Sequence, residues 1–147
     1  MRISTRARYG MQAMLALALD QGAGPLSIKE IAERRGLPEH YLEQLITPLR
    51  RASLVLSARG AQGGYVLARP ASTITLLEIV EAVEGPFAVE ECGCPAGAPH
   101  LHGFCLEHAV WTKLKQAVDA CLGGRTLADL RDEALAVGRA AVPLYDI

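Results

Sequence analysis

The sequence predicts a mainly α-helical fold that carries one small β-hairpin and a long helix near its carboxyl end. Three observations lead to this fold class. Half of the 147 residues are apolar but only 5% are aromatic, which favours a helical core of alanine, leucine and valine over a β-sandwich. Apolar residues recur at helical spacing in several segments. Two β-prone runs, Leu54–Ser57 and Tyr65–Leu67, flank a glycine-rich turn, which is typical of a hairpin.

The first two helices are indicated by composition and by a capping motif. Residues 4–20 are rich in helix-forming residues with a wide apolar face, and the segment Gln21–Pro25 ends that helix. Ser27 and Glu30 have the spacing of a capping box, in which each side chain accepts a hydrogen bond from the backbone of the other. We therefore expect a second helix over about 28–35.

A third helix is expected over 38–51. Gly36 breaks the preceding helix, and Pro38 suits a first helical turn, where no N–H group is needed. Apolar residues that recur along this segment must face the core: Leu42, Leu45, Ile46 and Leu49. Pro48 removes one helical hydrogen bond, so we expect a kink or a loose last turn.

These elements together match a winged helix-turn-helix. Two helices joined by a short glycine-containing turn form the helix-turn-helix, and the hairpin that follows it then serves as the wing. Arg59 lies at the glycine-rich tip of that hairpin. An arginine in this position suits a narrow minor groove of DNA.

The remainder of the chain predicts three further segments. Residues 74–83 form an amphipathic helix, and a long helix spans 106–122. The apolar stripe of the long helix contains Val110, Trp111, Leu114, Val118 and Cys121. This stripe is about five turns long, and one small domain is not expected to bury an apolar surface of that length by itself. We therefore expect a second copy of the chain to cover it, which gives a homodimer. Residues 126–129 then open a short last helix.

We therefore divide the chain into three parts. Residues 1–85 form the DNA-binding domain, residues 86–105 a cysteine-rich sensor loop, and residues 106–147 the dimerisation helix with its tail. Residues 1–70 carry ten basic and five acidic side chains, whereas the rest carries five basic and eleven acidic ones, although the net charge is −1. A basic half beside an acidic half is typical of a nucleic-acid reader with a separate sensing region.

Other classes of protein fit the sequence poorly. No run of eighteen apolar residues is long enough to cross a membrane, and Met14–Leu19 ends in Asp20 without a cleavage site, so we expect a cytoplasmic protein. The chain has no glycine-rich phosphate loop and no serine nucleophile motif, so we do not expect an enzyme.

Several motifs resemble those of a known family. They are Ser27-Ile-Lys-Glu-Ile-Ala32, Tyr41-Leu-Glu-Gln44, Arg59-Gly, Gly63-Gly-Tyr65, Ile74-Thr-Leu-Leu-Glu-Ile79 and Cys105-Leu-Glu-His108 before Trp111. In this order they resemble the Rrf-two (Rrf2) family of winged-helix transcriptional regulators, to which IscR and NsrR belong, over roughly residues 1–135. The resemblance implies a homodimer that binds palindromic, double-stranded promoter DNA, in many members under the control of an iron–sulfur cluster.

The resemblance also suggests which residues contact DNA. It implies that Tyr41 and Gln44 meet bases and that Arg59 enters the minor groove; glutamine pairs well with adenine edges. Other residues expected to contact DNA lie near these positions or at the starts of the first two helices, and they are Arg6, Arg8, Ser27, Glu39, His40, Arg50, Arg51 and Gly60. The arginines among them suit phosphates, while Glu39 and His40 affect sequence preference. Glu43 repels phosphate unless it accepts a hydrogen bond from a cytosine.

A cysteine-rich stretch precedes the long helix. Residues 91–108 hold three of the four cysteines and three of the four histidines. Clustered cysteines in the cytoplasm more often indicate metal or redox chemistry than a disulfide. Cys121 is expected to be a small buried apolar residue instead.

The resemblance implies that Cys92 and Cys105 occupy positions of the family's cluster ligands. Cys94 departs from the family pattern, because it follows Cys92 after a single glycine. One reading is an iron–sulfur cluster, [2Fe–2S] or [4Fe–4S], on Cys92, Cys94 and Cys105, with a fourth ligand from His108, His100, His102 or the other subunit. A zinc site of the Cys₃His type is an alternative. A thiol switch without metal is another.

Overall fold

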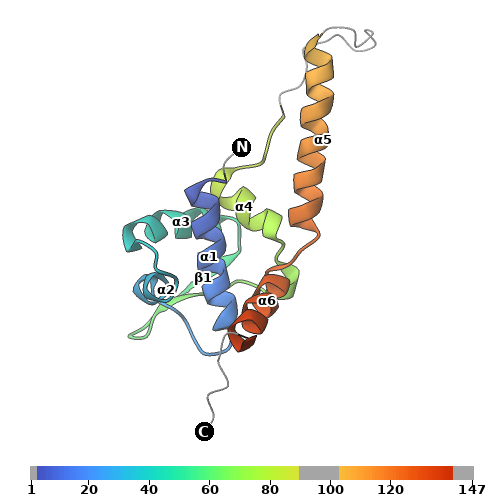
Figure 1. Ribbon diagram of the computed structural model, residues 1–147. Helices are drawn as coiled ribbons and strands as arrows, with labels where there is room; N and C mark the ends of the chain where they lie inside the picture. Colours follow the sequence, from blue (N-terminus) through green and yellow to red (C-terminus); the bar gives the residue numbers. More distant parts are fainter. Residues whose placement is uncertain (1–2, 90–102, 141–147) are drawn as a thin grey trace.

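The computed structural model describes residues 3–89 and 103–140, and for residues 103–107 and 140 it describes the backbone alone. The helices and strands are α1 (Thr5–Leu19), α2 (Ile28–Arg35), α3 (Glu39–Arg51), β1 (Val55–Ala58), β2 (Gly64–Leu67), the 3₁₀ turn η1 (Ala71–Thr73), α4 (Leu76–Glu84), α5 (Gly103–Gly123) and α6 (Leu127–Ala140). Figure 1 shows α5 projecting from a body that the other elements form, with α6 packed back beside α1. The predicted fold class, mainly helical with a two-stranded wing, is confirmed.

Hydrogen-bonded caps fix where the helices begin. The predicted capping box at the start of α2 is present: the Ser27 N–H donates to Glu30 Oε2 at 2.8 Å, and the Glu30 N–H donates to Ser27 Oγ at 3.2 Å. Thr75 and Glu78 form a second capping box, which the sequence analysis missed although the T-x-x-E spacing signals it. As a result α4 begins at Leu76 rather than at residue 74.

Helix α3 keeps its helical form through Pro48 and ends at Arg51. The four apolar residues expected to face the core are all buried, with exposed fractions of 0 to 3%: Leu42, Leu45, Ile46 and Leu49. Their packing offsets the hydrogen bond that proline removes. Gly36 ends α2 in the left-handed conformation (φ 63°), so the turn into α3 is as short as the sequence predicts.

The wing is tied to the segment that precedes α2. Strands β1 and β2 are antiparallel, and Leu26 adds a bridge to the outer edge of β2 through its backbone: its N–H donates to the Tyr65 carbonyl at 3.0 Å, and the Tyr65 N–H donates back at 2.7 Å. A Cβ atom on Gly64 would lie 2.5 Å from the Leu26 carbonyl carbon. Gly64 is therefore required where the wing approaches the helix-turn-helix.

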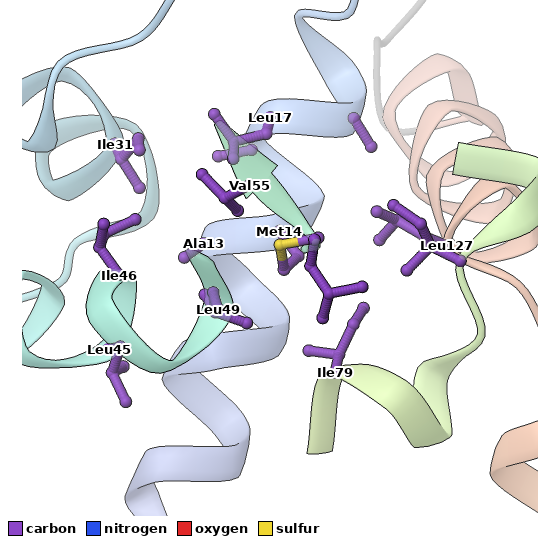
Figure 2. Packing of buried hydrophobic residues seen from close by; sticks show 14 of the residues in the cluster. Ala13, Met14, Leu17, Ile31, Leu45, Ile46, Leu49, Val55, Ile79 and Leu127 are labelled. Atoms are coloured by element: carbon purple, nitrogen blue, oxygen red, sulfur yellow. The ribbon is translucent and has the colours of Figure 1, made fainter. Parts of the chain in front are cut away.

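One apolar cluster joins nearly every element of the body. Figure 2 shows Ala13, Met14 and Leu17 of α1 facing side chains from α2, α3, β1 and α4, with Leu127 of α6 beside them. Leu127 is fully buried in this cluster. The start of α6 is therefore part of the core of the winged helix-turn-helix body, and the three-part division of the chain stays a prediction.

The carboxyl-terminal region differs from expectation in three respects. Helix α5 begins at Gly103, three residues earlier than expected, and α6 is 14 residues long rather than short. Cys121 is exposed, not buried, because α5 projects from the body and no described residue of the chain covers that side. In the part of the chain that the structure describes, no helix is long and apolar enough to span a membrane.

Candidate DNA interface and metal-ligand positions

The outer face of α3 is polar and exposed. Glu39, His40, Glu43 and Gln44 are all exposed, and they lie opposite the buried apolar residues of the same helix. Glu43 lies four residues after Glu39 and three after His40, and Gln44 lies four after His40, so the four positions form one continuous face. This face can enter a groove of DNA without disturbing the core, as a recognition helix requires.

Tyr41 lies at the boundary between this face and the core. It is half-buried, and its ring meets the ring of Tyr9 from α1 edge to face, with centroids 5.3 Å apart and planes at 84°. This T-shaped arrangement is the favoured one for aromatic pairs. It restricts the orientation of Tyr41 at the base of the recognition face.

Ser27 has its side chain engaged in helix capping. Its hydroxyl donates to Glu30 Oε2 at 2.8 Å and accepts the Glu30 N–H. The hydrogen bond from the Ser27 N–H, followed by that from its hydroxyl, lowers the pKa of Glu30. The half-buried Ser27 thus stands at the amino end of α2, where helix N–H groups favour a nearby anion such as a phosphate.

The tip of the wing presents Arg59 and Gly60 to solvent. Both are exposed, and Gly60 has φ 124°, a conformation that suits glycine. The Gly63 N–H donates to the Gly60 carbonyl at 3.0 Å, which closes the turn. A Cβ atom on Gly63 would lie 2.8 Å from the Ala58 carbonyl oxygen, so this glycine keeps the tip narrow.

The arginines of the body fall into two groups. Arg6 donates from Nε to the Val83 carbonyl at 2.9 Å, Arg35 donates to Gln12 at 2.8 Å, and Arg34 pairs with Asp20. These three, together with Arg69, which pairs with Glu78, stabilise contacts between elements, which sequence reasoning did not foresee for Arg6. In the second group the side chain makes no hydrogen bond or ion pair with any described residue, and its members are Arg8, Arg50, Arg51 and Arg59. All four are exposed and so have free guanidinium groups for phosphates.

A surface depression of about 430 Å³ lies between the end of α3 and strand β1. Its lining residues are Thr47, Arg50, Arg51, Val55, Leu56 and Ser57. Two unpaired guanidinium groups and two hydroxyls give it the chemistry of a phosphate site. Sequence reasoning found the arginines but missed Thr47, Leu56 and Ser57, because only the packing of β1 against α3 brings them together.

The predicted metal ligands fall mostly outside the described residues. This holds for Cys92, Cys94, His100 and His102. Cys105 and His108 are one turn apart near the start of α5, a spacing that places both positions on one side of the helix. His108 is half-buried. Within residues 3–89 and 103–140, no three potential metal ligands cluster.

Helix α5 exposes the apolar stripe that its sequence predicts. Val110 and Trp111 are 62% and 51% exposed in the single chain, and Cys121, further along the same side, is also exposed. Leu114 and Val118, between them, are only partly buried. Large apolar side chains in one contiguous row mark a surface that a partner covers.

The fold and this surface define a class of protein. A winged helix-turn-helix with an exposed recognition helix, a narrow arginine-tipped wing and unpaired arginines beside them is a DNA-binding transcriptional regulator. Residues 3–133 match the Rrf2 family model, described as "Iron-dependent Transcriptional regulator". The chain belongs to the Rrf2 family, which confirms the resemblance found in the sequence.

Similar proteins include two differently named regulators. CymR of Bacillus subtilis is 44% identical over 133 residues, covering 88% of this chain and 89% of the relative. The solved structure of that "Global Cysteine Regulator" superposes with a TM-score of 0.75 over 90% of this chain and 98% of its own, at 41% identity. IscR of Escherichia coli is 39% identical over 134 residues, 88% of this chain and 80% of the relative. The structure of T. potens IscR gives a TM-score of 0.75 at 42% identity, over 91% of this chain and 88% of its own.

These relatives are transcriptional regulators and not enzymes, as the sequence predicts for this chain.

Proposed function

We propose that this protein is a cytoplasmic, homodimeric, sequence-specific regulator that binds palindromic promoter DNA and senses a signal through its cysteine-rich segment. The observation that carries the DNA-binding part is that the outer face of α3, the depression at its end and the wing tip are all exposed and polar or basic. Membership of the Rrf2 family supports the same function.

Each part of this surface has its own role in the proposal. Tyr41 and Gln44 read bases in the major groove, with Glu39 and His40 adjusting sequence preference. Arg59, beside Gly60, enters the minor groove. The residues that hold phosphates are Arg8, Arg50 and Arg51, together with the amino end of α2 at Ser27. Arg6 acts indirectly, because its guanidinium group contacts the end of α4.

The dimer forms through the exposed stripe of α5. A second copy of the chain is the partner whose apolar surface matches that of the helix, and a two-fold axis places two recognition helices on two half-sites. The exposed Val110, Trp111 and Cys121 support this interface.

An iron–sulfur cluster is the proposed sensor. Its ligands are Cys92, Cys94 and Cys105, with His108 in the fourth position, and a thiolate set with one imidazole suits such a cluster. The spacing of Cys105 and His108 on α5, the family description as iron-dependent and the likeness to IscR support this choice. When bound, a cluster supplies a redox-sensitive and labile group at the start of the dimer helix.

A thiol switch without metal is the second candidate. The spacing of Cys92 and Cys94, with one glycine between them, favours it, because neighbouring thiols form reversible oxidation products readily. The likeness to CymR, a regulator named for cysteine, supports it as well. A zinc site on the same residues is the remaining alternative.

Replacement of Arg59 by alanine tests the DNA-binding surface. The probe is a duplex that the wild-type protein selects from a random library. Loss of a minor-groove arginine costs about 1–3 kcal/mol of binding free energy, so affinity falls at least several-fold. Arg139→Ala, at an exposed position on α6, is the matched control and leaves the affinity unchanged. Equal affinity of the Arg59→Ala and wild-type proteins would refute the assignment of the wing.

Purification without oxygen tests the sensor. Visible absorption and the iron, sulfide and zinc content per chain separate the three candidates. Brown protein with matched iron and sulfide supports the cluster, and serine variants at Cys92, Cys94 and Cys105 then identify its ligands. Protein that stays colourless after cluster reconstitution excludes it, leaving the zinc site if zinc is present and the thiol switch if it is not.

A further inference from the structure

Helix α1 lies between the recognition helix and α4 (Figure 1). Its amino-terminal half makes contacts with both neighbours. The residues that make them are Ser4, Arg6, Tyr9 and Gly10. Since they lie within two turns of one helix, their relative positions are fixed.

On one side, α1 supports Tyr41. The rings of Tyr9 and Tyr41 meet edge to face, and Tyr9 is one of the partly buried residues that pack against the core. The side chains of Glu39 and His40, the neighbours of Tyr41 at the exposed start of α3, make no hydrogen bond with any described residue. The Tyr9 ring therefore restrains Tyr41 on the outer side of this first turn of α3, while the buried Leu42 anchors the same turn in the core.

On the other side, α1 holds the end of α4. Arg6 Nε donates to the Val83 carbonyl at 2.9 Å, and the Ser4 hydroxyl donates to the Glu84 carboxylate while accepting the Ala7 N–H. A Cβ atom on Gly10 would come within 3.1 Å of Val83 Cγ1, so the two helices approach closely there. The last residues of α4 cannot shift without moving α1.

We propose that Tyr9 is a positioning residue for DNA recognition, which holds Tyr41 in its binding orientation, and that the Arg6 contact with Val83 fixes α1 in the place where Tyr9 does so. The proposal rests on the proposed DNA-binding function, because Tyr41 is assigned to the DNA surface there. According to this proposal, Tyr9 and Arg6 contribute to the affinity for the selected DNA although neither side chain touches DNA.

The test is a double-mutant cycle with the full-length protein and the selected duplex. Tyr9→Leu removes the ring but keeps an apolar side chain, and Tyr9→Met serves as a second ring-free variant. Because an aromatic pair contributes a modest energy beyond burial, each weakens affinity for the selected duplex by about two- to twelvefold. Affinity for an unrelated duplex of equal length stays the same. Tyr9→Phe retains the ring and restores wild-type affinity.

The cycle separates positioning from a general structural role. In a Tyr41→Leu background, Tyr9→Leu causes no further loss, since its effect passes through Tyr41. Arg6→Lys keeps the charge but loses the Nε donor, and it too weakens affinity in a manner not additive with Tyr9→Leu. Arg34→Lys, an equally conservative change in an exposed ion pair, is the control. Thermal unfolding of each variant confirms that it is folded.

Two results would overturn the proposal. One is wild-type affinity in both ring-free variants, and the other is an equal loss from Tyr9→Leu with and without Tyr41. A wild-type protein that selects no duplex at all would refute the proposed DNA-binding function itself, which is a distinguishable outcome.

Discussion

Helices α3 and α5 are both amphipathic, but the apolar face of α3 is buried whereas that of α5 is largely exposed. The apolar residues of α3 are at most 3% exposed, because α1, α4 and β1 cover them. Those of α5 include Val110 at 62% and Trp111 at 51% exposure. The apolar face of α3 is covered by its own chain, whereas the apolar stripe of α5 stays exposed and forms the proposed dimer interface. The difference separates residues that stabilise the fold from residues that build the assembly.

A core substitution in α3 is expected to have the largest effect. Leu45 is fully buried, so Leu45→Ala leaves a cavity and lowers the free energy of unfolding by about 2–5 kcal/mol. Chemical denaturation measures this change. Gln44→Ala, on the exposed face next to it, alters stability by less than about 0.5 kcal/mol. If the two variants were equally stable, the burial of this face would be wrong.

The corresponding substitution in α5 is expected to act on assembly. Trp111→Ala removes the largest exposed apolar side chain of the stripe, and a large aromatic residue at an interface centre contributes about 2 kcal/mol or more. The dimer dissociation constant therefore rises about thirtyfold or more, as sedimentation equilibrium can measure, while helical content is retained. Gln116→Ala, at an exposed position on another side of α5, is the control. An unchanged dissociation constant would place the interface elsewhere.

At the proposed DNA surface, arginines with unpaired side chains can be compared with an arginine that forms an ion pair. Arg50→Gln and Arg51→Gln each remove a proposed phosphate contact, so the slope of log affinity against log salt concentration decreases by about 0.9 per substitution. Arg34→Gln removes a guanidinium group that is paired with Asp20 and should leave the slope unchanged. Equal slopes in all three variants would show that the depression beside α3 binds no phosphate.

The sequence predicted the body of the protein well because its signals are local. Helical spacing identified the buried residues of α3, and the capping box at Ser27 placed the start of α2. Glycine at position 36 marked the turn between them. These features depend on residues within one or two turns of each other, and tertiary packing then confirms them.

Features that depend on distant pairs were not predictable in the same way. Arg6 and Arg8 carry the same charge. Of the two, only Arg6 donates to the Val83 carbonyl, because α4 packs against α1 beside it. The sequence indicates Gly64 as part of a glycine-rich turn, whereas its close approach to Leu26 follows from the isolated backbone bridge between Leu26 and Tyr65. Cys121 was expected to be buried because periodicity reveals an apolar side and not what covers it.

The smallest predicted effect concerns the caps that start three helices. Hydrogen bonds from the backbone N–H groups of Ser27 and Thr126 lower the pKa values of Glu30 and Asp129. Burial acts to raise the pKa of Glu78, but hydrogen bonds from Thr75 and Arg69 outweigh it, and this pKa is lowered too.

Carboxylates with lowered pKa values bind fewer protons in the folded state than in the unfolded state, so stability rises with pH in their titration range. Their contribution is present above the ordinary values of 4.5 for glutamate and 3.8 for aspartate, and it is lost as the pH falls through the lower folded values. The melting temperature should therefore decrease below about pH 4.5. Glu78→Gln should make this decrease shallower, whereas Glu81→Gln, on the same helix but outside the cap, should leave it unchanged. Identical pH profiles for wild type and Glu78→Gln would show that this capping box contributes equally in both protonation states.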